Sequence, residues 1–208
     1  MFEPLRKLAL FPKAPLERKL DFLMSIDGQI SRVEAKVLMD LAKSTPPETV
    51  IVEIGSYRGR STIALAFGSL AGVGNPVYAI DPHLKFQGIL GGCFGPADQA
   101  EFYQNVATSN VGEIVSVVSL PSIAAARSWS DRNISLLWVD GDHSYKAVRE
   151  DFEAWEAYVI NGGKIAFHDN TVPGVQTLIR ELTCAKNVVP VGVVGSLSWF
   201  KFKSTEDA

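Results

Sequence analysis

Carboxylates and imidazoles follow three predicted strands of this chain, at the point where each strand ends. They are Asp81 and His83 after one strand, Asp140 and His143 after a second, and His168, Asp169 and Asn170 at the end of a third. All three histidines of the chain belong to this set. Because ligands of open α/β sheets bind beyond the carboxyl ends of the strands, we expect these side chains to share one binding crevice.

Two of these carboxylates indicate a metal site. Asp140 and Asp169 would bring hard oxygen ligands from neighbouring strands, a set that suits Mg²⁺ with water and substrate completing the octahedron. The third ligand is open, because Asn170 offers an amide oxygen whereas the imidazole of His168 suits Mn²⁺ or Fe²⁺ better. The competing interpretation is that polar residues of these segments only cap the helices that follow.

His143 is the candidate general base. It follows Asp140 by three residues, and the ordinary pKa of an imidazole, near 6.5, suits proton transfer at neutral pH. A neighbouring metal would lower the pKa of a substrate hydroxyl and so make its deprotonation feasible. The alternative is a hydrogen-bonded histidine with a structural role only.

A glycine turn lies at the centre of the expected site. The mostly apolar segment 50–54 reads as a buried parallel strand, Gly55-Ser56-Tyr57-Arg58-Gly59 as a turn, and the residues after Ser61 as a helix. This order leaves backbone N–H groups free to bind the polar part of a nucleotide-like ligand. Asp81 closes a strand 26 residues after Gly55 and can accept hydrogen bonds from ribose hydroxyls, although an Asp before Pro82 also suits a plain turn.

The elements that must position these residues alternate along the chain. Strands are predicted at 50–54, 76–80, 114–118, 134–139 and 163–168. Helices are predicted near 60–70, 98–109, 122–129, 144–158 and 174–183. This alternation predicts an α/β fold, a Rossmann-like doubly wound sheet covered by helices on both faces. Residues 188–194 and 197–203, joined at Gly195-Ser196, predict a closing antiparallel hairpin.

The chain is expected to form a single compact domain, with an N-terminal helical extension at 1–45 before a second part at 46–208. In the extension, Ser31 and Glu34 have the spacing of a capping box at the start of a helix. Residues 84–97 carry Gly88, Gly91, Gly92 and Gly95 and predict a long loop of the kind that often serves as a lid.

The composition excludes several classes of protein. The net charge of −3 gives no electrostatic footprint for nucleic acid, and no apolar run approaches the ~20 residues of a membrane span. Cys93 and Cys184 are the only cysteines, which suggests neither a disulfide framework nor a zinc site. A cytoplasmic enzyme with a small-molecule partner, able to form homo-oligomers, is the plain expectation.

Two segments resemble a known family. Val52 to Ser61 is similar to the first motif of class I S-adenosylmethionine-dependent methyltransferases, and Ala79-Ile80-Asp81 is similar to the acidic ribose motif that follows it. The string from Leu136 to Tyr145, with Gly162 to Asp169, resembles the small O-methyltransferases related to macrolide-sugar enzymes. The likeness covers about residues 28–203 and implies a reversed seventh strand, in agreement with the predicted terminal hairpin.

The resemblance implies roles for individual residues. The cofactor-binding set would be Glu53, Gly55, Ser56, Tyr57, Gly59, Ser61, Asp81, Ser119 and Asp140, with Ser61 at the methionine carboxylate and Ser119 near the adenine. Asp140 and Asp169 match two metal ligands, and catechol-type relatives point to Asn170 as the third. The sugar-modifying relatives carry an acid where this chain has His168. His143 aligns with the catalytic base.

The leading interpretation is therefore an O-methyltransferase that uses S-adenosylmethionine and a divalent metal, expected to be Mg²⁺. Its acceptor would be a hydroxyl of a sugar-containing natural product, a saccharide or a phenol. One alternative is a nicotinamide-dependent oxidoreductase, which expects Gly-x-Gly-x-x-Gly where this turn has only Gly55 and Gly59. The other is a non-catalytic protein that binds an adenosyl cofactor.

Overall fold

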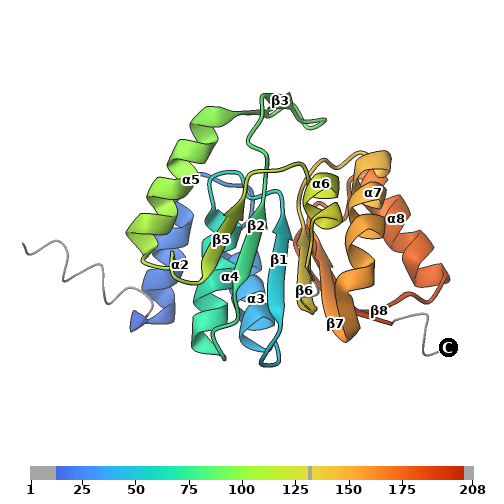
Figure 1. The fold of residues 1–208 in the computed structure, drawn as a ribbon, viewed down its shortest axis with the longest axis horizontal. Helices are drawn as coiled ribbons and strands as arrows, with labels where there is room; N and C mark the ends of the chain where they lie inside the picture. Colours follow the sequence, from blue (N-terminus) through green and yellow to red (C-terminus); the bar gives the residue numbers. More distant parts are fainter. Residues whose placement is uncertain (1–12, 131–132, 204–208) are drawn as a thin grey trace, which may run out of the picture.

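The computed structural model describes residues 13–130 and 133–203 and places a seven-stranded sheet at the centre of the molecule (Figure 1). The strand order is β5-β2-β1-β6-β7-β9-β8. The bounds are β1 Val50–Ile54, β2 Val77–Ile80, β5 Val115–Val118, β6 Ile134–Val139, β7 Val159–Phe167, β8 Val188–Val194 and β9 Leu197–Phe202. From β5 to β7 all neighbours are parallel, and β9 runs antiparallel to both β7 and β8. The predicted sheet with a reversed terminal strand is confirmed.

Helices cover both faces of the sheet. One face packs against α2 (Leu16–Ser25), α3 (Arg32–Lys43), α4 (Arg60–Ala71) and α5 (Pro96–Ser109). The other packs against α6 (Ser122–Arg127), α7 (Tyr145–Trp155) and α8 (Pro173–Cys184), and the short 3₁₀ helix η2 (Glu156–Tyr158) follows α7. The central strands β1 and β6 are buried along their whole length because both faces are covered. This is the layered arrangement that the alternation of segments predicts.

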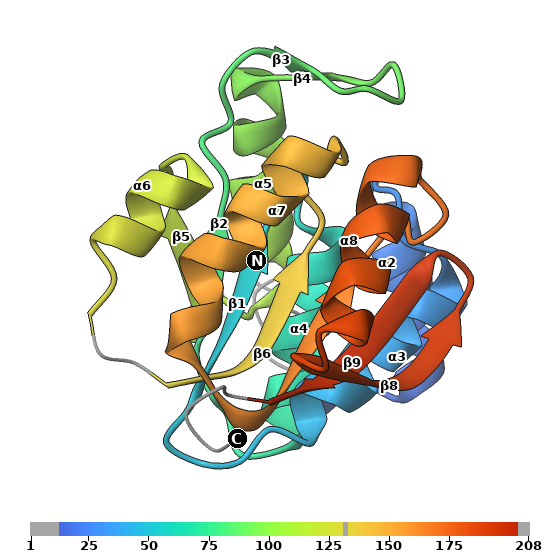
Figure 2. The same cartoon turned by 90° about the vertical axis from the view of Figure 1, so that its right-hand side faces the viewer.

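Two predicted segments differ from the structure. Strand β7 begins at Val159 rather than near 163, because Val159 pairs with Ile134 ahead of a register shift; Gly162, with φ +79°, lies within this strand. The long loop 84–97 contains a short hairpin of β3 (Phe86–Gln87) and β4 (Cys93–Phe94), and helix α5 already begins at Pro96. Figures 1 and 2 show this hairpin projecting beyond the sheet.

The N-terminal helices share the core of the sheet. Ser31 and Glu34 form the predicted capping box at the start of α3, and Leu38 of this helix is completely buried. Helices α3 and α4 touch so closely that a Cβ atom on Gly68 would lie 2.2 Å from the carbonyl oxygen of Met39. Of the predicted extension 1–45, residues 1–12 lie outside the described part of the chain, and α2 and α3 pack against the sheet.

The order of the strands fixes where a ligand can bind. Successive strands β1, β2 and β5 are added toward one edge of the sheet, and β6 and β7 are then added on the other side of β1. The order of the strands therefore reverses between β1 and β6. Such a reversal leaves a crevice at the carboxyl ends of the two strands. In the described parts of the chain, no helix is both long and apolar enough to span a membrane.

Candidate functional site

A cavity of about 760 Å³ opens at the carboxyl ends of β1 and β6. Nine of the predicted site residues line it: Gly55, Ser56, Tyr57, Ser61, Asp81, Asp140, His143, His168 and Asp169. The segments 28–30 and 121–123, the hairpin β3–β4 and the first turns of α7 contribute further walls. The structure thus brings most of the residues predicted from the ends of different strands into one cavity.

The glycine turn after β1 depends on a close approach between two strand ends. Gly55 has φ +83°, and a Cβ atom there would lie 2.2 Å from the carbonyl oxygen of Asp140. Only glycine allows this conformation and this contact together. The turn therefore brings the end of β1 against the end of β6, at the base of the cavity.

Asp81 fastens this turn to the end of β2. Its Oδ2 accepts hydrogen bonds from the backbone N–H groups of Ser56 and Tyr57, both at 3.0 Å, and its Oδ1 accepts one from His83 at 2.8 Å. Two of the N–H groups that the turn was expected to offer to a ligand are therefore bound by Asp81. Each carboxylate oxygen has more than one lone pair, so Asp81 can still accept hydrogen bonds from a ligand in the cavity.

Glu53 lies beneath the turn and is completely buried. The hydroxyl of Thr62 donates a hydrogen bond to its carboxylate. Burial, with smaller contributions from the carboxylates of Asp140 and Asp81, raises the pKa of Glu53 to about 8 against the opposing effect of the Ser61 and Thr62 hydroxyls. The side chain does not line the cavity, and its hydrogen bond with Thr62 ties the end of β1 to the first turn of α4.

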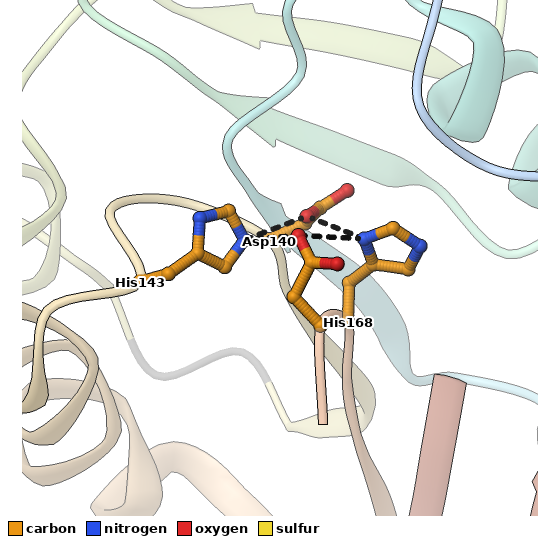
Figure 3. A group of neighbouring side chains, drawn as sticks. Asp140, His143 and His168 are labelled. Carbon is orange, nitrogen blue, oxygen red and sulfur yellow. Dashed lines mark ion pairs between the residues drawn. The ribbon is translucent and has the colours of Figure 1, made fainter. Parts of the chain in front are cut away.

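Four side chains gather where β6 and β7 end (Figure 3). The Nε2 atom of His143 lies 3.4 Å from Oδ1 of Asp140 and 3.0 Å from Oδ2 of Asp169. The Nδ1 atom of His168 lies 3.2 Å and 3.4 Å from the same two oxygens. One donor atom from each of the four residues falls within 4.8 Å of the others. Two imidazoles therefore face the same pair of carboxylates, a set of donors able to surround a metal ion.

The charges of this cluster shift its proton equilibria. Burial alone would lower the pKa of each histidine, but Asp140 and Asp169 outweigh it and raise the pKa to about 9 for His143 and about 10 for His168. The neighbouring imidazoles of His143 and His168 hold the pKa of Asp169 well below its usual range. These values favour the positively charged imidazolium form of both rings at neutral pH when no metal is bound. A bound cation would displace protons from this cluster.

Some predicted residues lie outside the cavity. Ser119 is exposed, and its hydroxyl accepts a hydrogen bond from Gln99 of α5. Gly59 precedes α4 and packs against Phe102. The side-chain amide of Asn170 donates to Ser198 of β9 at 2.7 Å, and this residue does not line the cavity. His83, by contrast, does line the cavity, and its Nε2 lies 2.8 Å from the carbonyl oxygen of Tyr57.

Other residues of the site were missed in the sequence. Asp151 of α7 lines the cavity although only 8% of it is exposed, and burial raises the pKa of its carboxyl to about 6. In the sequence, Asp151 looks like any solvent-exposed carboxylate on the polar face of an amphipathic helix, so no signal marked it as a site residue. Arg60 donates to the carbonyl oxygens of Ile26 and Ile30 and so holds the segment that forms one wall.

Comparisons with known proteins agree with this geometry. A family model described as a methyltransferase domain matches residues 52–170. An uncharacterized protein of Acanthamoeba polyphaga mimivirus is 29% identical over 90 residues, which cover 39% of this chain and 41% of that protein. The match thus spans less than half the length of this curated relative.

The solved structures that resemble the fold include two named O-methyltransferases. An O-methyltransferase from Bacillus cereus, determined in complex with SAH, has a TM-score of 0.64 and 18% identity, and the match covers 89% of this chain and 90% of that chain. The apo TDP-rhamnose 3'-O-methyltransferase of calicheamicin biosynthesis has a TM-score of 0.60 and 15% identity, covering 83% of this chain and 78% of that chain. At these identities the likeness concerns the fold.

Proposed function

Since this chain belongs to the family of methyltransferase domains, whose model matches residues 52–170, we propose that it transfers a methyl group from S-adenosylmethionine to a hydroxyl oxygen of a small molecule. The proposal rests on one observation: the glycine turn, the carboxylate of Asp81 and the cluster of histidines and aspartates all line the same cavity.

The cofactor would lie across the carboxyl ends of β1 and β2. Gly55 and Ser56 line the cavity here, and Asp81 offers carboxylate oxygens to ribose hydroxyls. Ser61 lines the same cavity at the start of α4, where the N-terminal end of a helix favours a negatively charged group such as the methionine carboxylate. The SAH bound to the Bacillus cereus relative supports this choice of ligand.

The chemistry needs positioning and one proton transfer. The acceptor oxygen attacks the sulfonium methyl group, an oxygen–carbon bond forms as the sulfur–carbon bond breaks, and S-adenosylhomocysteine leaves. We propose that His143 accepts the hydroxyl proton. Its Nε2 faces Asp140 and Asp169, while the other ring nitrogen points away from both carboxylates (Figure 3) and is the one available to the acceptor.

The cluster also fits a divalent metal. Nε2 of His143 and Nδ1 of His168 are buried and have no hydrogen-bond partner among the described residues, although both face carboxylates. A cation held by Asp140, Asp169 and Nδ1 of His168 would supply the partner that this nitrogen lacks. When bound, the ion would supply positive charge that acidifies the acceptor hydroxyl and returns the pKa of His143 toward neutral. Asp140 and Asp169 are the proposed oxygen ligands.

The acceptor would enter beside the hairpin β3–β4. Leu84, Ile89 and Leu90 of this region line the cavity, yet each is more than half exposed. This apolar wall suits the body of a phenol or of a sugar-containing natural product whose hydroxyl reaches His143. The rhamnose-modifying relative supports the sugar alternative.

The deciding experiment is methyl transfer from radiolabelled S-adenosylmethionine to a panel of hydroxylated metabolites. We expect label in at least one phenolic or sugar hydroxyl. Binding of the sulfonium nucleoside without turnover on any acceptor would favour a non-catalytic binding protein. Binding of a nicotinamide dinucleotide in its place would favour the oxidoreductase, which the spacing of Gly55 and Gly59 disfavours.

A further inference from the structure

The two nitrogens of His168 have different environments. Nε2 lies 3.0 Å from Oγ of Ser196, in the turn between β8 and β9. The Ser196 hydroxyl donates its own hydrogen to Oε1 of Glu34 at 2.9 Å, and its backbone N–H donates to the same oxygen at 2.7 Å. Because the hydroxyl hydrogen is used in this way, Oγ can only accept from His168, so Nε2 carries the hydrogen.

The other nitrogen therefore faces the carboxylates as the potential ligand. Nδ1 of His168 is buried without a hydrogen-bond partner among the described residues, and Oδ1 of Asp140 lies 3.2 Å away. The residue as a whole is only 3% exposed, so water cannot readily replace a missing partner. An imidazole whose far nitrogen donates to a fixed acceptor presents its near nitrogen for metal binding.

Asn170, the alternative third ligand, is held elsewhere. Its side-chain amide donates to Oγ of Ser198 at 2.7 Å, and its backbone N–H donates to the carbonyl oxygen of Ser196 at 3.0 Å. Both bonds tie Asn170 to the hairpin β8–β9. Asn170 also does not line the cavity, whereas His168 does. The imidazole of His168 is therefore better placed than the amide of Asn170 to bind beside Asp140 and Asp169.

Glu34 is itself rigidly placed. It is 3% exposed, and its Oε2 accepts from the backbone N–H of Ser31 at 2.7 Å in the capping box of α3. Gly195 makes the approach possible, since a Cβ atom there would lie 2.6 Å from Oε1 of Glu34. The N-terminal helix α3 thus supports the orientation of a side chain at the end of β7.

We propose that Glu34 and Ser196 are positioning residues that fix His168 as an Nδ1 ligand, and that the resulting site prefers a first-row transition ion such as Mn²⁺ to Mg²⁺. This inference deepens the proposed function, because it concerns the same metal site. Mg²⁺ strongly favours oxygen ligands and dehydrates reluctantly, whereas Mn²⁺ accepts imidazole nitrogen beside carboxylates.

The test uses the metal-free full chain with Mn²⁺ or Mg²⁺ alone, and neither cofactor nor acceptor. Calorimetry should give an affinity for Mn²⁺ at least about tenfold higher than for Mg²⁺. Pulsed electron paramagnetic resonance of bound Mn²⁺ should show coupling to an imidazole nitrogen, and His168→Gln should remove or weaken that coupling.

Ser196→Ala tests the positioning role directly. It removes the acceptor of the Nε2 hydrogen while the backbone bond to Glu34 can remain, and it should weaken Mn²⁺ binding about 10- to 100-fold. Ser196→Thr keeps the hydroxyl and should restore most of the affinity. Asn170→Ala is the matched control beside the site and should leave the Mn²⁺ affinity within about twofold of the original.

Several results would overturn the inference. Equal affinities for Mn²⁺ and Mg²⁺, or nitrogen coupling that is unchanged in His168→Gln, would remove His168 from the ligand set. A loss of affinity in Asn170→Ala but not in Ser196→Ala would assign the third position to Asn170. These measurements of metal binding do not depend on methyl transfer. If the separate transfer assay found no turnover while Mn²⁺ still bound selectively, the proposed function would be contradicted and this inference would stand.

Discussion

The Nε2 atom of His143 lies 3.0 Å from Oδ2 of Asp169, a residue 26 positions further along the chain. The contact joins the loop after β6 to the residue that follows His168 at the end of β7. A carboxylate placed behind an imidazole orients the ring and stabilises its protonated form. This relationship is the physical basis for proposing His143 as the proton acceptor.

Replacing His143 by Ala should lower kcat by roughly 10²- to 10⁴-fold, the usual contribution of acid–base catalysis. The affinity for S-adenosylmethionine should stay nearly constant, because Asp81 and the glycine turn remain. Steady-state kinetics and calorimetry on the same preparations measure the two quantities.

The pH profile separates this role from a structural one. Asp140 and Asp169 raise the pKa of His143 to about 9 in the metal-free protein, and a bound cation would lower it. The kcat of the unmodified enzyme should therefore rise with pH along a limb that lies below about pH 9. The His143→Ala variant should lose this limb, and a variant that kept it together with full turnover would place the base elsewhere.

Asp81→Ala should weaken binding of S-adenosylmethionine by about 1–3 kcal/mol, because ribose hydroxyls and backbone N–H groups would lose their acceptor. The affected N–H groups are those of Ser56, Tyr57 and His83. Asp81→Asn keeps one acceptor oxygen and should lose less affinity. Calorimetry decides, and an unchanged dissociation constant in both variants would exclude Asp81 from the cofactor site.

Removal of metal should lower methyl transfer. Asp140 and Asp169 face two imidazoles in a buried cluster, and an ion held there would acidify the acceptor hydroxyl. Activity should fall in the presence of a chelator and return when Mn²⁺ or Mg²⁺ is added in excess. Full activity after exhaustive chelation would mean that the cluster works as ion pairs alone.

The arrangement of the strands could be predicted because local signals agreed with one another. The apolar strand 50–54, its glycine turn and the acidic ends of the later strands all carry patterns of short range. The hairpin in residues 84–97 could not be predicted, since its strands are two residues each and its glycines indicate only a loop. The early start of β7 was hidden by Gly162-Gly163, which reads as a turn.

The candidate site was predictable to a similar extent. Residues at strand ends are brought together by topology, so His143, His168 and Asp169 could be expected near Asp140. The contact of Ser196 with Glu34 joins residues 162 positions apart, and no periodic pattern encodes such a pair. The orientation of Asn170 toward Ser198 likewise depends on tertiary packing rather than on sequence spacing.

Gly68→Ala should destabilise the fold by about 1–3 kcal/mol, the usual cost of overpacking a close contact. The added methyl group would lie 2.2 Å from the backbone oxygen of Met39, so α3 and α4 must separate. Gly112→Ala is the control, since a Cβ atom there meets only Val106 at 4.0 Å. Urea unfolding of both variants measures the difference. Equal stability of the two would show that α3 does not pack tightly against α4.

The stability of the fold should depend on pH through Glu53. Burial raises its pKa from 4.5 to about 8, so between these values the folded protein holds a proton that the unfolded chain has released. The free energy of unfolding must therefore decrease as the pH rises through this window, by up to about 1.4 kcal/mol per pH unit from this group. Glu53→Gln removes this contribution and should make the decline shallower, while the raised pKa values of His143 and His168 keep part of the decline above about pH 6.5. Urea unfolding at pH 5, 6, 7 and 8 measures the difference.

Asp151 supplies the control for this prediction. Burial raises the pKa of its carboxyl from 3.8 to about 6. Its contribution to stability is therefore complete below about pH 4 and is lost as the pH rises from there to about 6. Asp151→Asn should therefore change the profile below about pH 6 and leave the slope between pH 6 and 8 as it is. If Glu53→Gln leaves the slope above pH 6 unchanged, Glu53 is ionised in the folded protein and its buried carboxylate is stabilised by Thr62 and Ser61 far more than the raised pKa implies.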